Sequence, residues 1–278
     1  MPSPAKLVRI QQRAWASERG IATDSQGYVV DLADNLFLQM SPQALAEFGS
    51  GDGGELGRPG NRGKMRALHS SSALAYNFFE YWRGRDASPL ASTLRLPAPI
   101  VGVDFERKYP TGLPGNAPNL DVVLTSPSGS VTAIESKFLE PYYGHGSASG
   151  FKAKYFESES GLWRVAGYPR CQELAERLYS DKAAFRLLNA AQLLKHILGL
   201  ATSGKQWALV YLWYEILGTS TAEHAAEAAE FARIAVADGI EFRALSYQSV
   251  FAEMQTGSGA AHQEYMAYLG GRYFAMPD

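Results

Sequence analysis

The sequence predicts an α/β (α+β) fold in which helices flank a central β-sheet. Three observations indicate this class. Residues 119–124 and 131–137 are short apolar runs joined by a turn-rich segment, which predicts a β-hairpin. Residues 207–217 form a dense apolar run that is typical of a buried central strand. Other segments carry apolar residues at three- and four-residue spacing and therefore predict helices.

From residue 67 onward the expected order is helix, three strands, helix and strand, with a further helix and strand appended. The serines at 70–72 are candidate N-terminal caps for the first helix, and Asp181 is the candidate cap for the second. The expected elements are residues 67–82, 100–109, 119–124, 131–137, 181–200, 207–217, 222–237 and 241–245.

We divide the chain into two parts. Residues 1–66 form an N-terminal extension, with a weak helix at 7–19, a helix start at Ser41-Pro42 and a Gly-rich basic loop at 49–63. Residues 67–278 form the main domain, with an insert at about 140–180.

The hairpin carries charged residues that are costly in an ordinary strand. Side chains alternate along a strand, so Glu135 and Lys137 share one face, while Ile134 and Phe138 point to the other. Asp121 lies on the neighbouring strand, and acids are depleted in strands. Carboxylates suit Mg²⁺, and a metal so placed can polarise a phosphodiester. A surface hairpin with a plain Glu/Lys pair is the alternative, and both interpretations are open on spacing alone.

The motif also carries a resemblance. Asp121, followed fourteen positions later by Glu135-Ser136-Lys137, resembles the PD-(D/E)xK, or restriction-endonuclease-like, nuclease superfamily. The wording NLDVVL…TAIESKFLEPY is similar to a group of bacterial restriction endonucleases within it. The chain departs from the usual pattern in having Leu120, and not proline, directly before the Asp.

This resemblance implies a mixed central sheet flanked by helices in αβββαβ order, with residues 67–278 as the nuclease domain. It implies that Asp121 and Glu135 hold the metal and that Lys137 assists the attacking water. It further suggests that Gln192 and Lys195, on the helix after the motif, face the cleft and act on water or phosphate. Their alternative role is a solvated polar face, and the role of the adjacent His196 is left open.

Superfamily members often add an acid from the first helix or first strand to the metal shell. Glu80 is the expected third metal ligand, because an unpaired charge among aromatic neighbours would be costly. Its alternative is a surface ion pair with Arg83. Glu106 is a second candidate, with an ordinary strand-end ion pair as its alternative.

Several basic residues are candidate nucleic-acid contacts. Arg58, Arg62 and Lys64 belong to the Gly-rich loop, which is either a basic arm for a phosphate backbone or a plain linker. His145 lies in the glycine-rich loop after the motif, where the alternative is a flexible connection. Lys195 completes the set. The aromatic and basic residues at 151–168 suit either nucleic-acid contact or a small packed subdomain.

Composition sets limits on these expectations. The 278 residues carry a formal net charge of −2, which argues against a strongly basic nucleic-acid-binding surface. The single cysteine, Cys171, excludes an internal disulfide and a multi-cysteine zinc site, so we expect a reducing cytoplasm. No apolar run reaches the roughly 18 residues of a spanning helix, so we expect no membrane association.

The expected function is a Mg²⁺-dependent endodeoxyribonuclease, with Mn²⁺ as a possible substitute, that serves in restriction, DNA defence or repair. DNA is the expected partner, and a homodimer is expected because cutting both strands is easiest with two symmetric sites. A non-catalytic nucleic-acid-binding module and an unrelated small-molecule α/β enzyme are the alternatives. The recognition sequence and the choice between DNA and RNA depend on loop geometry.

Overall fold

A computed structural model describes residues 3–51, 53–143, 150–180 and 185–275. Within these residues, five strands form the central sheet in the order β3-β4-β5-β6-β7. The first two pairings are antiparallel and the last two are parallel, so the predicted mixed sheet is confirmed. The strands are β3 (Gly102–Lys108), β4 (Asn119–Thr125), β5 (Val131–Lys137), β6 (Trp207–Trp213) and β7 (Phe242–Ser246).

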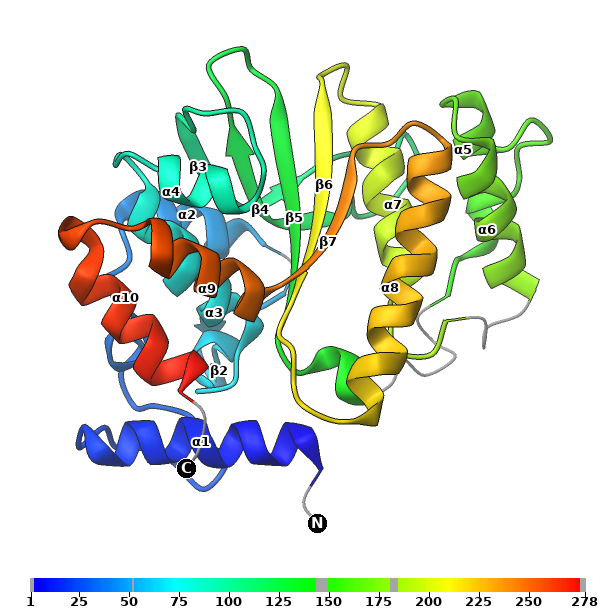
Figure 1. The fold of residues 1–278 in the computed structure, drawn as a ribbon. Helices are drawn as coiled ribbons and strands as arrows, with labels where there is room; N and C mark the ends of the chain where they lie inside the picture. The colour runs from blue at the N-terminus through cyan, green and yellow to red at the C-terminus, as the bar shows by residue number, and fades with distance from the viewer. Residues whose placement is uncertain (1–2, 52, 144–149, 181–184, 276–278) are drawn as a thin grey trace.

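Helices cover both faces of this sheet (Figure 1). One face packs against α3 (Ser71–Phe79), α4 (Ser88–Thr93), α9 (Tyr247–Gly257) and α10 (Gln263–Leu269). The other packs against α6 (Pro169–Ser180), α7 (Ala190–Ala201) and α8 (Thr219–Ala237). The predicted order of helix, three strands, helix and strand is therefore confirmed, as are the appended α8 and β7.

The alternation predicted for the hairpin is also confirmed. Ile134 and Phe138 belong to the hydrophobic cluster on the α3 side of the sheet. Val131 and Ala133, which share the face of Glu135, belong to the cluster on the α7 side. The motif residues therefore project toward α7.

The helix before β6 is shorter than predicted. It begins at Ala190, where the Asn189 side chain accepts a hydrogen bond from the Gln192 amide at 3.1 Å. The amides of residues 186–188 donate to the Glu227 carboxylate on α8, so they are not available for a helix. The start predicted at Asp181 is therefore wrong, and Asp181 itself lies outside the described residues.

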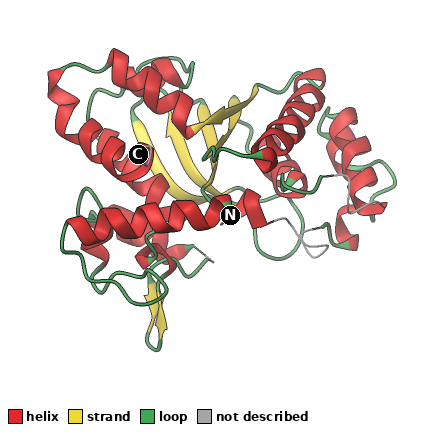
Figure 2. Ribbon diagram, turned by 60° about the horizontal axis from the view of Figure 1, so that its bottom comes forward, coloured by secondary structure: helices red, strands yellow, loops and turns green. Residues whose placement is uncertain are grey.

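The N-terminal part contains α1 (Pro4–Glu18) and α2 (Pro42–Ser50), close to the predicted positions. The segment expected to be an irregular loop forms a short hairpin of β1 (Gly57–Arg58) and β2 (Asn61–Arg62), which projects from the body in Figure 2. Gly60 at its turn has a φ of +81°, a conformation that favours glycine.

The two ends of the chain share one core. Arg272 is fully buried, and its guanidinium donates to the Asn35 carbonyl at 2.7 Å and lies over the Trp15 ring at 4.5 Å. The Gln12 side chain donates to the Arg272 carbonyl at 2.6 Å. Residues 1–66 are thus built into the hydrophobic core of the rest of the molecule.

Shorter elements complete the description. Between β5 and α7 the chain forms α5 (Leu162–Val165) and α6, at the position of the predicted insert. The remaining turns are η1 (Leu32–Asn35), η2 (Lys64–Arg66), η3 (Glu80–Trp82), η4 (Glu140–Tyr143), η6 (Ala153–Tyr155), η7 (Ala260–His262) and η8 (Gly270–Phe274). In the described part of the chain, no helix is long and apolar enough to cross a membrane.

Candidate active site

Three carboxylates lie side by side across three neighbouring strands. Val122 pairs with Ile134, so the next step in this antiparallel register places Asp121 opposite Glu135. The register of β3 with β4 likewise places Glu106 opposite Asp121. Directly opposed residues of an antiparallel pair face the same side of the sheet. The two motif acids therefore share a face, as a common metal site requires.

Glu135 is held between the Lys137 and His196 side chains in the interior. It is 1% exposed, and its carboxylate forms ion pairs with the Lys137 ammonium and, at 2.8 Å, with Nε2 of His196. Neither oxygen accepts a well-directed hydrogen bond from the described residues. Burial alone would raise the pKa of Glu135, but Lys137 and His196 outweigh it and lower that pKa to about 2. Glu135 is therefore ionised at neutral pH.

Asp121 has a different environment. It is half-buried, and one of its oxygens accepts a hydrogen bond from the Ser136 amide at 2.7 Å. Burial and then the neighbouring Glu135 raise its pKa well above the usual value. The two acids therefore favour opposite protonation states as long as no cation lies between them.

Glu106 is the third acid of the row. Burial, followed by the charge of Glu55, raises its pKa to about 7, against a hydrogen bond of 3.1 Å from the Asn119 side chain. Its φ of +51° is rare for a non-glycine residue, and strained backbone of this kind often occurs at functional sites.

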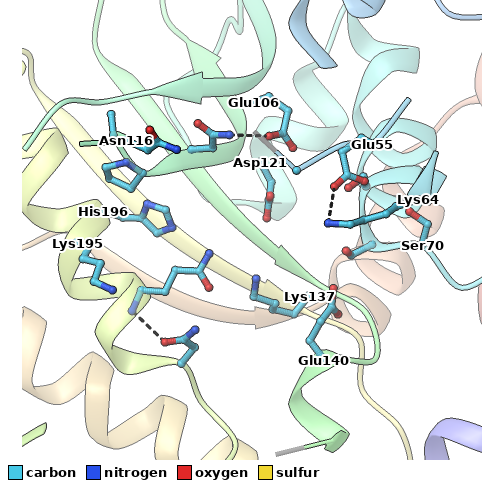
Figure 3. A pocket seen from close by; sticks show the side chains of 18 of the residues that line it. Glu55, Lys64, Ser70, Glu106, Asn116, Asp121, Lys137, Glu140, Lys195 and His196 are labelled. Atoms are coloured by element: carbon cyan, nitrogen blue, oxygen red, sulfur yellow. Dashed lines mark hydrogen bonds and ion pairs between the residues drawn. The ribbon is translucent and has the colours of Figure 1, made fainter. Parts of the chain in front are cut away.

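Glu106, Asp121, Lys137 and His196 line a cavity of about 1110 Å³. Figure 3 shows Asp121 and Lys137 in its middle. Lys195, His196 and Asn116 lie on one side, and Glu55, Lys64 and Ser70 lie on the other. The cavity therefore joins the end of β5 to the start of α3, to α7 and to the N-terminal segment.

Of the residues considered from the sequence, the structure brings Glu106, Asp121, Lys137, Gln192, Lys195 and Lys64 to this cavity. Glu135 lies behind them in the interior, paired with Lys137.

The structure does not bring Glu80 to the site. Its carboxylate pairs with the Arg83 guanidinium at 2.7 Å and accepts from the Ser41 hydroxyl at 3.2 Å. Glu47 joins the same ion-pair network through Arg83. Glu80 therefore does not line the cavity of Asp121 and Lys137, and its carboxylate pairs with Arg83 as the alternative from the sequence has it, although this pair is buried and not on the surface.

Arg58 and Arg62 lie on the β1–β2 hairpin and do not line the cavity. Arg62 pairs with Asp24, and its guanidinium lies 3.6 Å from the centre of the Tyr28 ring. His145 falls outside the described residues.

Sequence reasoning did not assign several residues that the structure brings to the site: Glu55, Asn116, Lys152, Lys154 and His196. For His196 a signal was present, because Gln192 and His196 are four residues apart and share a helix face. The pairing of His196 with Glu135 depends on how α7 docks on β5, which no local pattern reports.

The donor set fits a hard divalent cation. The described residues contain no group of three or more His, Cys, Asp or Glu side chains able to hold a metal. Mg²⁺, however, usually takes only one or two protein carboxylates and fills its other positions with water and phosphate oxygens. Asp121 and Glu135 supply that pair, and the oxygens of Glu135 lack directed hydrogen bonds.

The sheet is mixed and has helices on both faces, and the end of its central hairpin carries Asp121, Glu135 and Lys137. This fold and site define a restriction-endonuclease-like protein. The model of the family described as restriction endonuclease associating with ARP matches residues 9–274, so the chain belongs to that family. Membership indicates a nuclease-like role. Comparison with curated proteins and with solved structures finds no match.

Proposed function

We propose that the protein is a Mg²⁺-dependent endodeoxyribonuclease, with Mn²⁺ as a substitute ion, that acts in restriction, DNA defence or repair. The observation that carries the proposal is the placement of Asp121 and Glu135 on one face of adjacent strands, with Lys137 in the cavity that Asp121 lines. An unrelated small-molecule enzyme would be favoured by acids on opposite faces, and the register supports the reverse.

In this proposal Asp121 and Glu135 hold the ion. When bound, it supplies positive charge that polarises the phosphodiester and makes water more acidic. The oxygen of water loses a proton and forms a bond to phosphorus, one ester P–O bond breaks, and the leaving oxygen takes up a proton.

The remaining groups act on charge and position. Lys137 faces the cavity as an ammonium, because Glu135 and Asp121 outweigh the effect of burial and raise its pKa. It can stabilise the negative charge that develops on the phosphate oxygens. The Gln192 amide, half-buried on the same cavity, can accept from water or donate to phosphate. His196 positions Glu135.

Local charge offsets the net charge of −2. Among the described residues, the cavity is lined by five lysines: Lys64, Lys137, Lys152, Lys154 and Lys195. A polyanion therefore meets ammonium groups at the site itself, whatever the sign of the whole chain. We further propose a homodimer for cutting both strands and a cytoplasmic setting, which the lone Cys171 permits.

The test is cleavage of supercoiled plasmid by the purified chain with Mg²⁺ or Mn²⁺ and with EDTA. We expect nicked or linear product only with the metal. Lys137→Ala should lower the rate by roughly 10²–10³, the range seen when one charge-stabilising donor is removed. Asp121→Asn should abolish cleavage, because it removes a ligand while keeping the size of the side chain.

Thermal melting must accompany these variants, because Lys137→Ala removes the ammonium that pairs with buried Glu135. Lys205→Gln is the matched control. Lys205 is exposed and precedes β6 at the opposite end of the strand from the motif, so this change should leave cleavage intact. Plasmid left whole by the wild-type chain under both metals and on varied sequences would refute the proposal.

A further inference from the structure

Three lysines of the cavity lie close enough for Lys152 and Lys154 to act on the charge of Lys195. Lys152 and Lys154 come from the segment after β5, and Lys195 comes from α7. All three line the same cavity as Asp121. Two separate parts of the fold therefore deliver positive charge to one place.

Within the described part of the chain, these lysines pair with no acidic side chain. Lys64 and Lys137 are the cavity lysines that pair with carboxylates, namely those of Glu55 and Glu135. No carboxylate of the described residues lies at ion-pair distance from the other three. Uncompensated like charges repel one another, so an arrangement of this kind is stabilised by an anion.

Lys195 and Lys154 are held by aromatic rings and a backbone carbonyl, which do not neutralise their positive charge. The Lys195 ammonium lies 5.2 Å from the centre of the Phe151 ring and 5.7 Å from that of Tyr155. Burial, then Lys152 and Lys154, lowers the pKa of Lys195, as expected for a cation held among cations. Lys154 donates to the Pro114 carbonyl.

A glycine permits this approach of Lys154. Gly115 has a φ of +99°, and a Cβ built on it would lie 3.3 Å from the Lys154 ammonium. A side chain there would crowd the ammonium, and the positive φ disfavours one in any case. The loop before β4 and the segment after β5 are thus fitted to each other around the lysine.

We propose that Lys152, Lys154 and Lys195 form a subsite for a backbone phosphate of the DNA strand, next to the phosphate cleaved at Asp121 and Glu135. This inference rests on the proposed nuclease function and adds to it how the strand is held. An ammonium is a point-charge phosphate ligand, and three can share the oxygens of one or two phosphates. The acid row and the subsite would then hold neighbouring phosphates of one strand.

The test is the salt dependence of DNA binding, measured by fluorescence anisotropy in an Asp121→Asn background so that no cutting occurs. Lys152→Gln with Lys195→Met removes two charges, keeps the aliphatic packing of Lys195 on its two rings, and leaves the Lys154 contact in place. We expect affinity to fall on the order of tenfold or more, and the slope of log K against log salt to drop by about 2, near one per phosphate contact.

Two controls separate charge from folding. Lys195→Arg keeps the charge and should retain the slope, whereas Lys205→Gln changes an exposed lysine far along the sheet and should alter nothing. In the cleavage-competent chain, the double variant should raise KM more than it lowers kcat. An unchanged slope in the double variant would overturn the subsite.

The binding of inorganic pyrophosphate, measured by calorimetry, distinguishes failure of the lysine subsite from failure of the nuclease proposal. If the wild type cuts DNA but the double variant binds DNA with the wild-type slope, the subsite is wrong and the nuclease stands. If the wild type neither cuts nor binds DNA, yet binds pyrophosphate in a lysine-dependent way, the anion site stands and the nuclease proposal falls.

Discussion

Replacing Glu106 by glutamine should make the protein more stable at high pH and leave its stability unchanged at low pH. The folded-state pKa of Glu106 is raised from 4.5 to about 7 by burial and by the charge of Glu55. A raised pKa means that the fold disfavours the ionised carboxylate. Below pH 4.5 both states carry the proton, so the wild type and Glu106→Gln have equal stability.

The free-energy cost that Glu106 adds to folding grows as the pH rises from 4.5 to about 7, because in this range the unfolded chain releases the Glu106 proton and the folded chain keeps it. Above about pH 7 the full cost is present. A shift from 4.5 to about 7 is 2.5 units, and at 1.36 kcal/mol per unit this corresponds to about 3 kcal/mol. Glu106→Gln removes this cost, and its amide oxygen can still accept from Asn119.

The assay is urea unfolding at pH 4 and pH 8 in EDTA, since a divalent cation would stabilise the charged carboxylates. Glu253→Gln, at an exposed position of α9, is the control and should show no pH-dependent difference. The reasoning is refuted if Glu106→Gln is no more stable than the wild type at pH 8, or if its advantage is equally large at pH 4.

Two further predictions concern folding. Gly199→Ala should destabilise the protein by about 1–3 kcal/mol despite the helix propensity of alanine, since the new Cβ would meet the Tyr109 carbonyl. Gly49→Ala in α2, where a Cβ meets nothing, should instead stabilise the protein by up to about 1 kcal/mol. If urea unfolding shows the same sign for both variants, this account is contradicted. A fragment of residues 67–278 should show no cooperative thermal transition, because it lacks the residues within 1–66 that contact buried Arg272. Cooperative melting of this fragment would show that residues 1–66 are a separable extension.

The hairpin and its neighbours were predictable because their signals are local. Alternation of side chains decides which face Glu135 and Lys137 share, and the turn-rich residues between the two runs dictate an antiparallel pair. The dense apolar run of β6 likewise reports a strand buried on both faces. The three motif residues, and the face that Glu135 and Lys137 share, therefore came from the sequence and its resemblance, whereas the register of β4 with β5 places Asp121 on that face.

Some boundaries were wrong because distant partners compete for the backbone. The predicted helix from Asp181 gives way to a start at Ala190, since Glu227 on α8 accepts hydrogen bonds from the amides that a longer helix would need. The Gly-rich segment has no hydrophobic period, yet it pairs with itself as a short hairpin.

The composition of the site was decided by the tertiary structure. Glu80 looked like a metal ligand from its aromatic neighbours, but the fold places Arg83 and Ser41 on its carboxylate. The sequence placed His196 on the helix face of Gln192 but left its role open, and docking of α7 on the sheet brings it to Glu135.

By itself, the sequence determined the main order of helices and strands, the face that Glu135 and Lys137 share and the residue types of the motif, because periodicity and residue type act over a few positions. Only the tertiary structure decided which distant charges meet there. Burial and pairing, which set the ionisation of Glu135 and gather Lys152, Lys154 and Lys195 in one cavity, arise between segments far apart in the chain.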